Sequence, residues 1–318
     1  MFELFSDTKE SLLFIVTTPL YFLFIGIEMF LSAQYRNERY SLEDTKENLF
    51  LMIANIGVDI IMRITGLGIL MICYEHKIFS VENVWLYWLL CLVLQDFAFW
   101  LMHYIDHSVR LFWAVHVTHH SSEKFNLTVG LRSSLLEPLY RFLYFTPIAF
   151  LGFKPADILL MFSITQLYGI FIHTQYVGKL GVLEKWFATP SNHRVHHGKN
   201  IKYLDRNMGM FLIIWDKLFG TYQEEEEEVQ YGLTTPLQER DLGNVMFHEF
   251  KSIWKDLKHA PDLKSKWMYV FGPPGWSHDG KSKTSKQLRE ELRKGSSPTP
   301  NHISTSRPVS PEHQPLQS

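Results

Sequence analysis

The sequence predicts an all-α integral membrane protein. We expect a bundle of about four to five membrane helices with a helical cap that holds a histidine-rich site for two metal ions. Long apolar runs recur along a chain of 318 residues, of which 46% are hydrophobic and 15% aromatic. Polar segments separate these runs, and many of the histidines gather in three clusters. The formal net charge is −2 and no basic recognition motif is present, so the sequence does not indicate nucleic-acid binding.

The apolar runs have lengths suited to a bilayer, whose hydrocarbon core needs roughly 20 residues of helix. They cover residues 11–31, 48–73, 84–102 and 139–172. In the second run Asp59 and Arg63 stand four residues apart and can pair on one helix face. The last run is interrupted by Pro147, Gly152 and Pro155, which predicts two helices in a hairpin. A soluble all-α protein with buried helices is the alternative.

The histidine clusters share a spacing that places their side chains on one helical face. His103 and His107 lie four residues apart, and the box H-x2-H-H occurs twice, at 116–120 and 193–197. A further histidine stands alone between the two boxes. The candidate metal ligands are His103, His107, His116, His119, His120, His173, His193, His196 and His197.

The number of histidines indicates which kind of metal site to expect. Nine imidazoles exceed the four ligands of a structural zinc site and the three of a catalytic one. They suit two ions with four or five imidazoles each and positions left open for dioxygen. Imidazole binds iron, zinc, copper and nickel alike, so the ligand type leaves the metal open. The membrane context favours iron.

Metal-bound imidazoles need partners that fix the orientation of each ring. Candidates that lie near the boxes in sequence are Asp96, Asp106, Glu123, Asn126 and Asp205. Asp96 ranks first, because it falls within an apolar run seven residues before His103 and ionisable residues at membrane depth tend to be functional.

The polar segments predict where the histidines lie relative to the membrane. Residues 116–137 and 174–210 are too polar to cross lipid, so we expect all boxes in a cap at one membrane surface, with Ser191 or Asn192 as N-cap of a short helix. Lysine and arginine are frequent in these segments, which predicts a cytosolic cap. We expect one oxygenase domain over 1–279 and a disordered polar tail over 280–318.

The motifs HYIDH, HVTHH and HRVHH resemble the three histidine boxes of the fatty acid hydroxylase/sterol desaturase superfamily of membrane non-haem diiron oxygenases. The resemblance covers roughly residues 90–276. Further stretches are similar to its alkylglycerol monooxygenase branch: HVTHHSSEKFNLTVGLRSS, FIHTQYVGKLG, TPSNHRVHHGKN, LIIWDKLFGTY, YGLTTPL and FGPPGW.

This resemblance implies that the nine histidines bind two iron ions and that dioxygen oxidises a membrane lipid. In that branch the ether carbon of an alkylglycerol is oxidised, releasing a fatty aldehyde and a glycerol derivative. The electron donor would be tetrahydrobiopterin or a redox protein. Two alternatives stay open: hydroxylation or desaturation of a sterol, fatty acyl or carotenoid chain, and a non-catalytic metal-loaded protein that binds lipid. Release of a fatty aldehyde would distinguish ether cleavage from hydroxylation or desaturation. A non-catalytic protein would consume no oxygen with any lipid.

Overall fold

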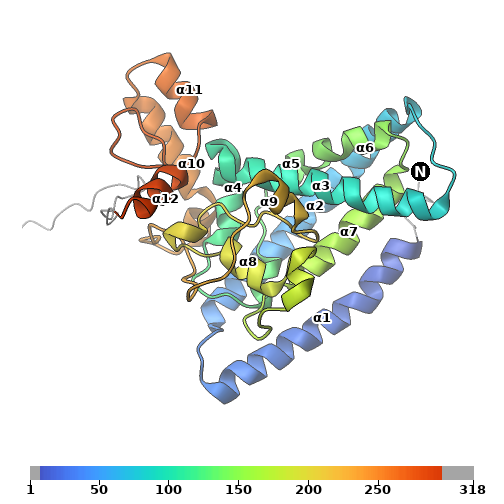
Figure 1. The fold of residues 1–318 in the computed structure, drawn as a ribbon, viewed down its shortest axis with the longest axis horizontal. Helices are drawn as coiled ribbons and strands as arrows, with labels where there is room; N and C mark the ends of the chain where they lie inside the picture. Colours follow the sequence, from blue (N-terminus) through green and yellow to red (C-terminus); the bar gives the residue numbers. More distant parts are fainter. Residues whose placement is uncertain (1–7, 296–318) are drawn as a thin grey trace, which may run out of the picture.

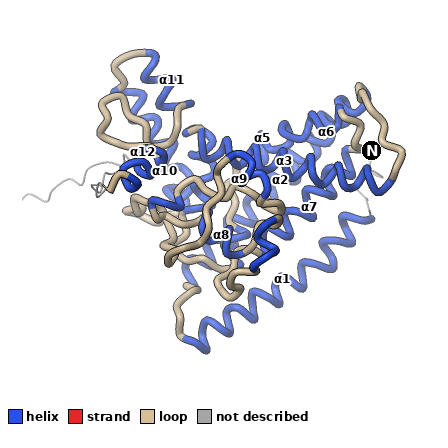
Figure 2. The backbone as a smooth tube through the Cα atoms, in the orientation of Figure 1, coloured by secondary structure: helices blue, strands red, loops and turns tan. Residues whose placement is uncertain are grey.

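A computed structural model describes residues 8–295 of the chain. Helices joined by loops make up this part, and the described residues contain no strand beyond one isolated antiparallel bridge between Phe187 and Leu212 (Figure 2). The expectation of an all-α fold is therefore confirmed.

Three helices are long and apolar enough to cross a membrane: α1 (Thr8–Tyr35), α2 (Leu42–Glu75) and α3 (Val84–Ser108). A shorter apolar helix, α7 (Pro155–Phe171), packs among them, between α1 and α3 (Figure 1). The number of apolar helices thus falls at the low end of the range expected from the sequence.

The long helices turn large apolar side chains outward. Ile15 of α1 is 69% exposed, and Ile53 and Ile61 of α2 are 66% and 64% exposed. Such extended apolar surface is unstable in water but suits contact with lipid. Within α2, Arg63 pairs with Asp59 at 3.4 Å, as their spacing predicted.

The apolar run at 139–172 is more broken than the expected pair of helices. It contains α5 (Pro138–Arg141), the 3-10 turn η3 (Phe142–Phe145), α6 (Thr146–Phe150) and α7. Pro147 stands in the first turn of α6 instead of ending a helix. The chain reverses at Gly152, whose φ of +100° and close approach to the carbonyl oxygen of Phe79 leave no room for a side chain.

The remaining elements form the cap at one end of the bundle (Figure 1). They are α4 (Arg110–His120), η2 (Leu127–Leu131), η4 (Gly181–Lys185), α8 (Pro190–His196), η5 (Ile201–Tyr203), α9 (Ile214–Phe219), α10 (Leu242–His259), α11 (Leu263–Phe271) and α12 (Ser285–Arg293). The loop between α1 and α2 lies at the same end, because Asn37 donates to Tyr176 and the carbonyl of Arg39 accepts from Asn126.

Helix α12 corrects part of the prediction for the C-terminal segment. Residues 285–293, which were expected to be disordered, form a helix with a capping box between Thr284 and Gln287. Arg289 of this helix donates to the carbonyl of Leu204, beside η5. The rest of the expected tail, from 296 onward, lies outside the described residues.

Candidate metal centre

The nine candidate histidines come from four helices whose ends meet at the cap. His103 and His107 lie on α3, and the HVTHH box lies on α4. His173 follows α7, and the HRVHH box occupies α8 and its C-cap. In two groups the ring nitrogens come within 4.8 Å of one another. The five-histidine group holds His103, His107, His116, His120 and His196, and the four-histidine group holds His119, His173, His193 and His197.

A sharp break between α3 and α4 brings the first two boxes face to face. Val109 is both the C-cap of α3 and the N-cap of α4, with an extended backbone (φ −120°, ψ 120°) that stops the helix from continuing. As a result α4 folds back along α3. The Nε2 atom of His116 thereby comes to 3.0 Å from the Nε2 atom of His103.

Helix α8 places the last box. Its N-cap is Thr189, two or three residues earlier than the Ser191 or Asn192 predicted from the sequence, which both lie inside the helix. Pro190 fills the first helical position, where no amide proton is needed, and the Asn192 side chain completes a capping box. This start orients His193 so that its Nε2 atom lies 2.8 Å from that of His173.

The outward nitrogens of four rings donate to backbone carbonyls. The Nδ1–O distances are 2.8 Å for His103–Met208, 2.8 Å for His119–Arg132, 2.7 Å for His173–Gly169 and 3.0 Å for His196–Arg206. Because a carbonyl oxygen can only accept, the proton must sit on Nδ1. The Nε2 lone pair of each ring therefore points into its group, as metal binding requires.

The inward nitrogens fit a metal ion. The Nε2 atoms of His107, His120, His196 and His197 are buried without a hydrogen-bond partner in the described structure, which is costly unless another ligand satisfies them. The Nε2–Nε2 separations of 2.8–3.0 Å also fit two nitrogens that bind one ion. Two bonds of about 2.1 Å with an N–metal–N angle near 90° give such a separation.

Burial keeps the rings in the neutral, metal-binding form. It lowers the pKa of His119 to about 4 and holds the pKa values of His120, His193, His196 and His197 well below 6.5. Repulsion between neighbouring imidazoles acts in the same direction. The cap thus offers a dense set of uncharged nitrogen donors at neutral pH.

Two of the five expected partner residues lie against the histidines. The Asp205 carboxylate is 3.2 Å from the Nδ1 atom of His107. Asp106 accepts from the Tyr140 hydroxyl at 2.8 Å, and its other oxygen lies 4.0 Å from the Nδ1 atom of His116.

The other three candidates hold the backbone around the site. The Asp96 carboxylate accepts from the amides of Phe211 and Leu212 and from the Trp215 indole, and so fixes the segment that follows Met208. Glu123 pairs with Arg240 at 3.4 Å. Asn126 caps η2 and donates to the carbonyl of Arg39.

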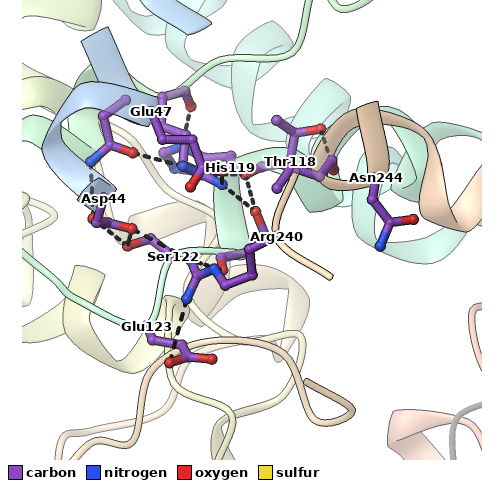
Figure 3. Close-up of polar contacts among 12 residues, drawn as sticks. Asp44, Glu47, Thr118, His119, Ser122, Glu123, Arg240 and Asn244 are labelled. Atoms are coloured by element: carbon purple, nitrogen blue, oxygen red, sulfur yellow. Dashed lines mark hydrogen bonds and ion pairs between the residues drawn. The ribbon is translucent and has the colours of Figure 1, made fainter. Parts of the chain in front are cut away.

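Sequence reasoning missed Arg132, which supports the four-histidine group. Its carbonyl accepts from His119, and its fully buried guanidinium donates to the carbonyl of Thr118 at 2.6 Å. The same guanidinium reaches α2, at 2.6 Å from Glu47 and 2.8 Å from Asn48. Figure 3 shows Glu47, Thr118 and His119 within this polar network.

The run of five glutamates at 224–228 also has a structural role. Glu225 makes two hydrogen bonds, of 2.8 and 2.7 Å, with the buried guanidinium of Arg194, the residue after His193 on α8. Arg132 lies in the stretch HVTHHSSEKFNLTVGLRSS and Arg194 in HRVHH, but nothing in either motif points to the partners of these arginines, so only the folded arrangement reveals their roles.

A pocket of about 840 Å³, counted with its open mouth, reaches the five-histidine group. Its inner wall includes His107, His120 and His196. Trp113 and Leu233 make its sides partly apolar. Its outer wall comes from later in the chain and includes 232–235, the inner face of α10 and Lys283.

The site agrees with what comparisons with known proteins show. The fatty acid hydroxylase family model matches residues 88–221, which contain all nine histidines. This histidine-bearing part of the chain is therefore similar to the fatty acid hydroxylase family.

Similarity to particular proteins extends beyond that part. The chain is 37% identical to alkylglycerol monooxygenase from Homo sapiens over 220 residues, which are 69% of this chain and 48% of the relative. Identity to alkylglycerol monooxygenase from Xenopus tropicalis is 32% over 278 residues, 86% of this chain and 61% of the relative. Ornithine lipid hydroxylase OlsE from Rhizobium tropici is 30% identical over 132 residues, 41% of this chain and 40% of that protein. The chain thus spans about half of the length of these relatives. No solved structure matches it.

Proposed function

We propose that the nine histidines bind two iron ions, one in the five-histidine group and one in the four-histidine group. The observation that carries this proposal is the convergence of the nine rings in two groups. Four of them have a buried Nε2 atom without a partner, and four, of which only His196 belongs to both sets, have the Nδ1 proton held by a backbone carbonyl. Such a pair of ions would supply the activation of dioxygen needed to attack an unactivated C–H bond.

The reaction we infer is a lipid monooxygenation, most specifically cleavage of an alkylglycerol ether. One oxygen atom of O2 enters the C–H bond of the ether carbon next to oxygen, and the other leaves as water with two electrons and two protons from a reductant. The resulting hemiacetal loses its glyceryl oxygen as an alcohol and leaves a fatty aldehyde. The similarity to alkylglycerol monooxygenases supports this choice of substrate.

The protein's own residues would act by positioning and by exclusion of water. Met208, Arg132, Gly169 and Arg206 each hold one histidine ring through a backbone carbonyl. Asp205 adds a carboxylate that can retain the proton on Nδ1 of His107. Burial of most of the rings limits the access of bulk water to the ligands, and the pocket that reaches His107, His120 and His196 is where a substrate could enter.

The electron donor and the orientation in the membrane form part of the same proposal. We infer tetrahydrobiopterin as donor, supported by the similarity to the alkylglycerol monooxygenase branch, with a redox protein as the alternative. The lysines and arginines of the cap support a location of the cap on the cytosolic side of the membrane. The contact between α12 and η5 suggests that the oxygenase unit includes residues up to 293.

Hydroxylation without cleavage is a second candidate. The identity to ornithine lipid hydroxylase OlsE favours it, because that relative's name describes addition of a hydroxyl group to a lipid. The two candidates share the metal site and differ in the product.

The test is an assay of the purified protein in detergent or nanodiscs. After iron has been quantified, alkylglycerol, tetrahydrobiopterin and oxygen are added, and fatty aldehyde and oxygen uptake are measured. Aldehyde that depends on the pterin supports ether cleavage. Oxygen uptake with a retained hydroxyl on a lipid supports the second candidate, and absence of uptake with every lipid tested contradicts both. His197→Ala serves as the inactive control, and His259→Ala, on the exposed end of α10, as the matched active one.

A further inference from the structure

The α10–α11 hairpin carries a stripe of large apolar side chains on its outer surface. Leu263, Trp267 and Phe271 recur every four residues along α11 and are 82%, 64% and 41% exposed. The rings of Trp267 and Phe271 lie 4.3 Å apart, so the stripe is continuous. The opposite face of α11 buries Ser265 and Tyr269 against the cap.

Helix α10 has the same organisation. It buries Val245, Glu249 and Ser252 on the face toward α4 and leaves Trp254 61% exposed. Phe247, two turns before Trp254, is also exposed. The outward faces of both helices therefore expose large apolar side chains, which is unusual for a surface in contact with water.

The hairpin is attached at the level where membrane helix α3 ends. The amide of Arg110, two residues after Ser108, donates to the carbonyl of Gly272 at 2.9 Å. Gly272 directly follows Phe271, the last residue of the stripe. Tyr104, one turn before the end of α3, is still 38% exposed among apolar neighbours that suit lipid. Figure 1 shows α10 and α11 beside α4 at this end of the bundle.

The charges around the stripe suit a lipid surface. Five exposed lysines flank it: Lys251, Lys255, Lys258, Lys264 and Lys266. The acidic side chains of Glu249 and Asp256 face inward and pair with Arg110, each at 2.7 Å. The ammonium of Lys258 lies 5.1 Å from the ring of Trp254. Tryptophan and lysine side by side are typical of the membrane–water interface, where lysine reaches anionic headgroups.

We propose that the α10–α11 hairpin lies in the headgroup region of the same bilayer that α1, α2 and α3 cross. Its apolar stripe faces the acyl chains, and its lysines contact anionic lipid headgroups. This proposal depends on the membrane helices and on the surface of the hairpin, and it is independent of the metal and of the reaction.

Helix α10 connects the hairpin to the candidate metal centre. The inner face of α10 contributes His248 and Glu249 to the pocket that reaches the five-histidine group. With its outer face in the lipid headgroups, α10 forms the wall between the membrane surface and that pocket.

Spin-label accessibility in nanodiscs tests the proposal. On a Cys73→Ala/Cys91→Ala background, single cysteines replace each residue from 263 to 271 in the full chain, in bilayers of phosphatidylcholine and phosphatidylserine. Collisions of the label with oxygen, which concentrates in lipid, are compared with collisions with water-soluble nickel-EDDA. Ile60→Cys on α2 is the bilayer control, and Glu290→Cys, exposed on α12, is the aqueous control.

We expect collisions with oxygen to exceed collisions with nickel-EDDA at 263, 267 and 271, as at the bilayer control position 60. Along the helix, the ratio of the two collision rates should vary with a period of about 3.6 residues. Because these three side chains are exposed, their replacement leaves the fold intact. Dominant nickel-EDDA collisions at all three positions, as at 290, would place the stripe in water and overturn the proposal. Protection from both reagents would mean that protein covers the stripe, and would overturn it equally.

Discussion

The Nδ1 atom of His119 lies 2.8 Å from the carbonyl oxygen of Arg132, whose guanidinium in turn reaches Glu47 and Asn48 on α2. One residue thus connects a candidate metal ligand in the cap to a membrane helix. The orientation of the His119 ring depends on this connection as well as on α4.

Replacing Arg132 should therefore disturb the metal site as well as the fold. Arg132→Gln leaves Glu47 unpaired and frees the backbone that holds His119, and breaking a buried ion pair costs about 3–5 kcal/mol. We expect a lower melting temperature and a loss of iron. Arg141→Gln is the control, because Arg141 is also buried and paired, with Asp59 at 2.9 Å and Glu137 at 3.1 Å. Equal iron retention in the two folded variants would show that Arg132 has no role beyond stability.

Asp205 should influence metal affinity through His107. Removing the partner of a metal-bound histidine typically weakens metal binding about 10- to 100-fold. We expect Asp205→Ala to lose iron to a competing chelator faster than the unmodified protein. Asp205→Asn, which keeps an oxygen acceptor for Nδ1, should lose it at an intermediate rate. Asp279→Ala removes a surface carboxylate that pairs with Lys281 and should match the unmodified protein. An unchanged rate for Asp205→Ala would contradict the assigned role.

The metal-free protein should lose stability in mild acid. Burial lowers the pKa of His119 to about 4 and keeps those of His120, His196 and His197 well below the ordinary 6.5. Below pH 6.5 the unfolded chain therefore binds protons that the folded chain excludes. The free energy of unfolding consequently decreases as the pH is lowered. Melting temperatures of the chelator-treated protein from pH 7.5 to 5 measure this. A melting temperature that stays constant or rises over this range would contradict the burial of neutral rings.

The sequence predicted the parts of the site that depend on local spacing. Histidines four residues apart share a helix face whatever the tertiary structure, so the grouping of His103 with His107 could be foreseen. The same holds for the apolar run that became α3, because its length and composition are sufficient to define a membrane helix.

Parts that depend on contacts between distant segments could not be predicted. Asp96 ranked first by its closeness to His103, yet its carboxylate holds residues 211–215, more than a hundred positions later. Arg132 and Arg194 gain their roles from partners on α2 and in the glutamate run. Helix α12 was missed because its composition is polar, and packing against η5 supplies the stability that its sequence lacks.

Iron stoichiometry tests the central claim most directly. The protein is purified in detergent, and iron and zinc are quantified per chain by mass spectrometry in the unmodified protein, His119→Ala, His197→Ala and the surface control His259→Ala. We predict about two irons per chain in the unmodified protein and in His259→Ala, because the two histidine groups supply five and four ligands. We predict a clear loss of iron in His119→Ala and His197→Ala. Iron that stays the same in His119→Ala and His197→Ala, or an unmodified protein that binds no iron even after reconstitution, would contradict the account.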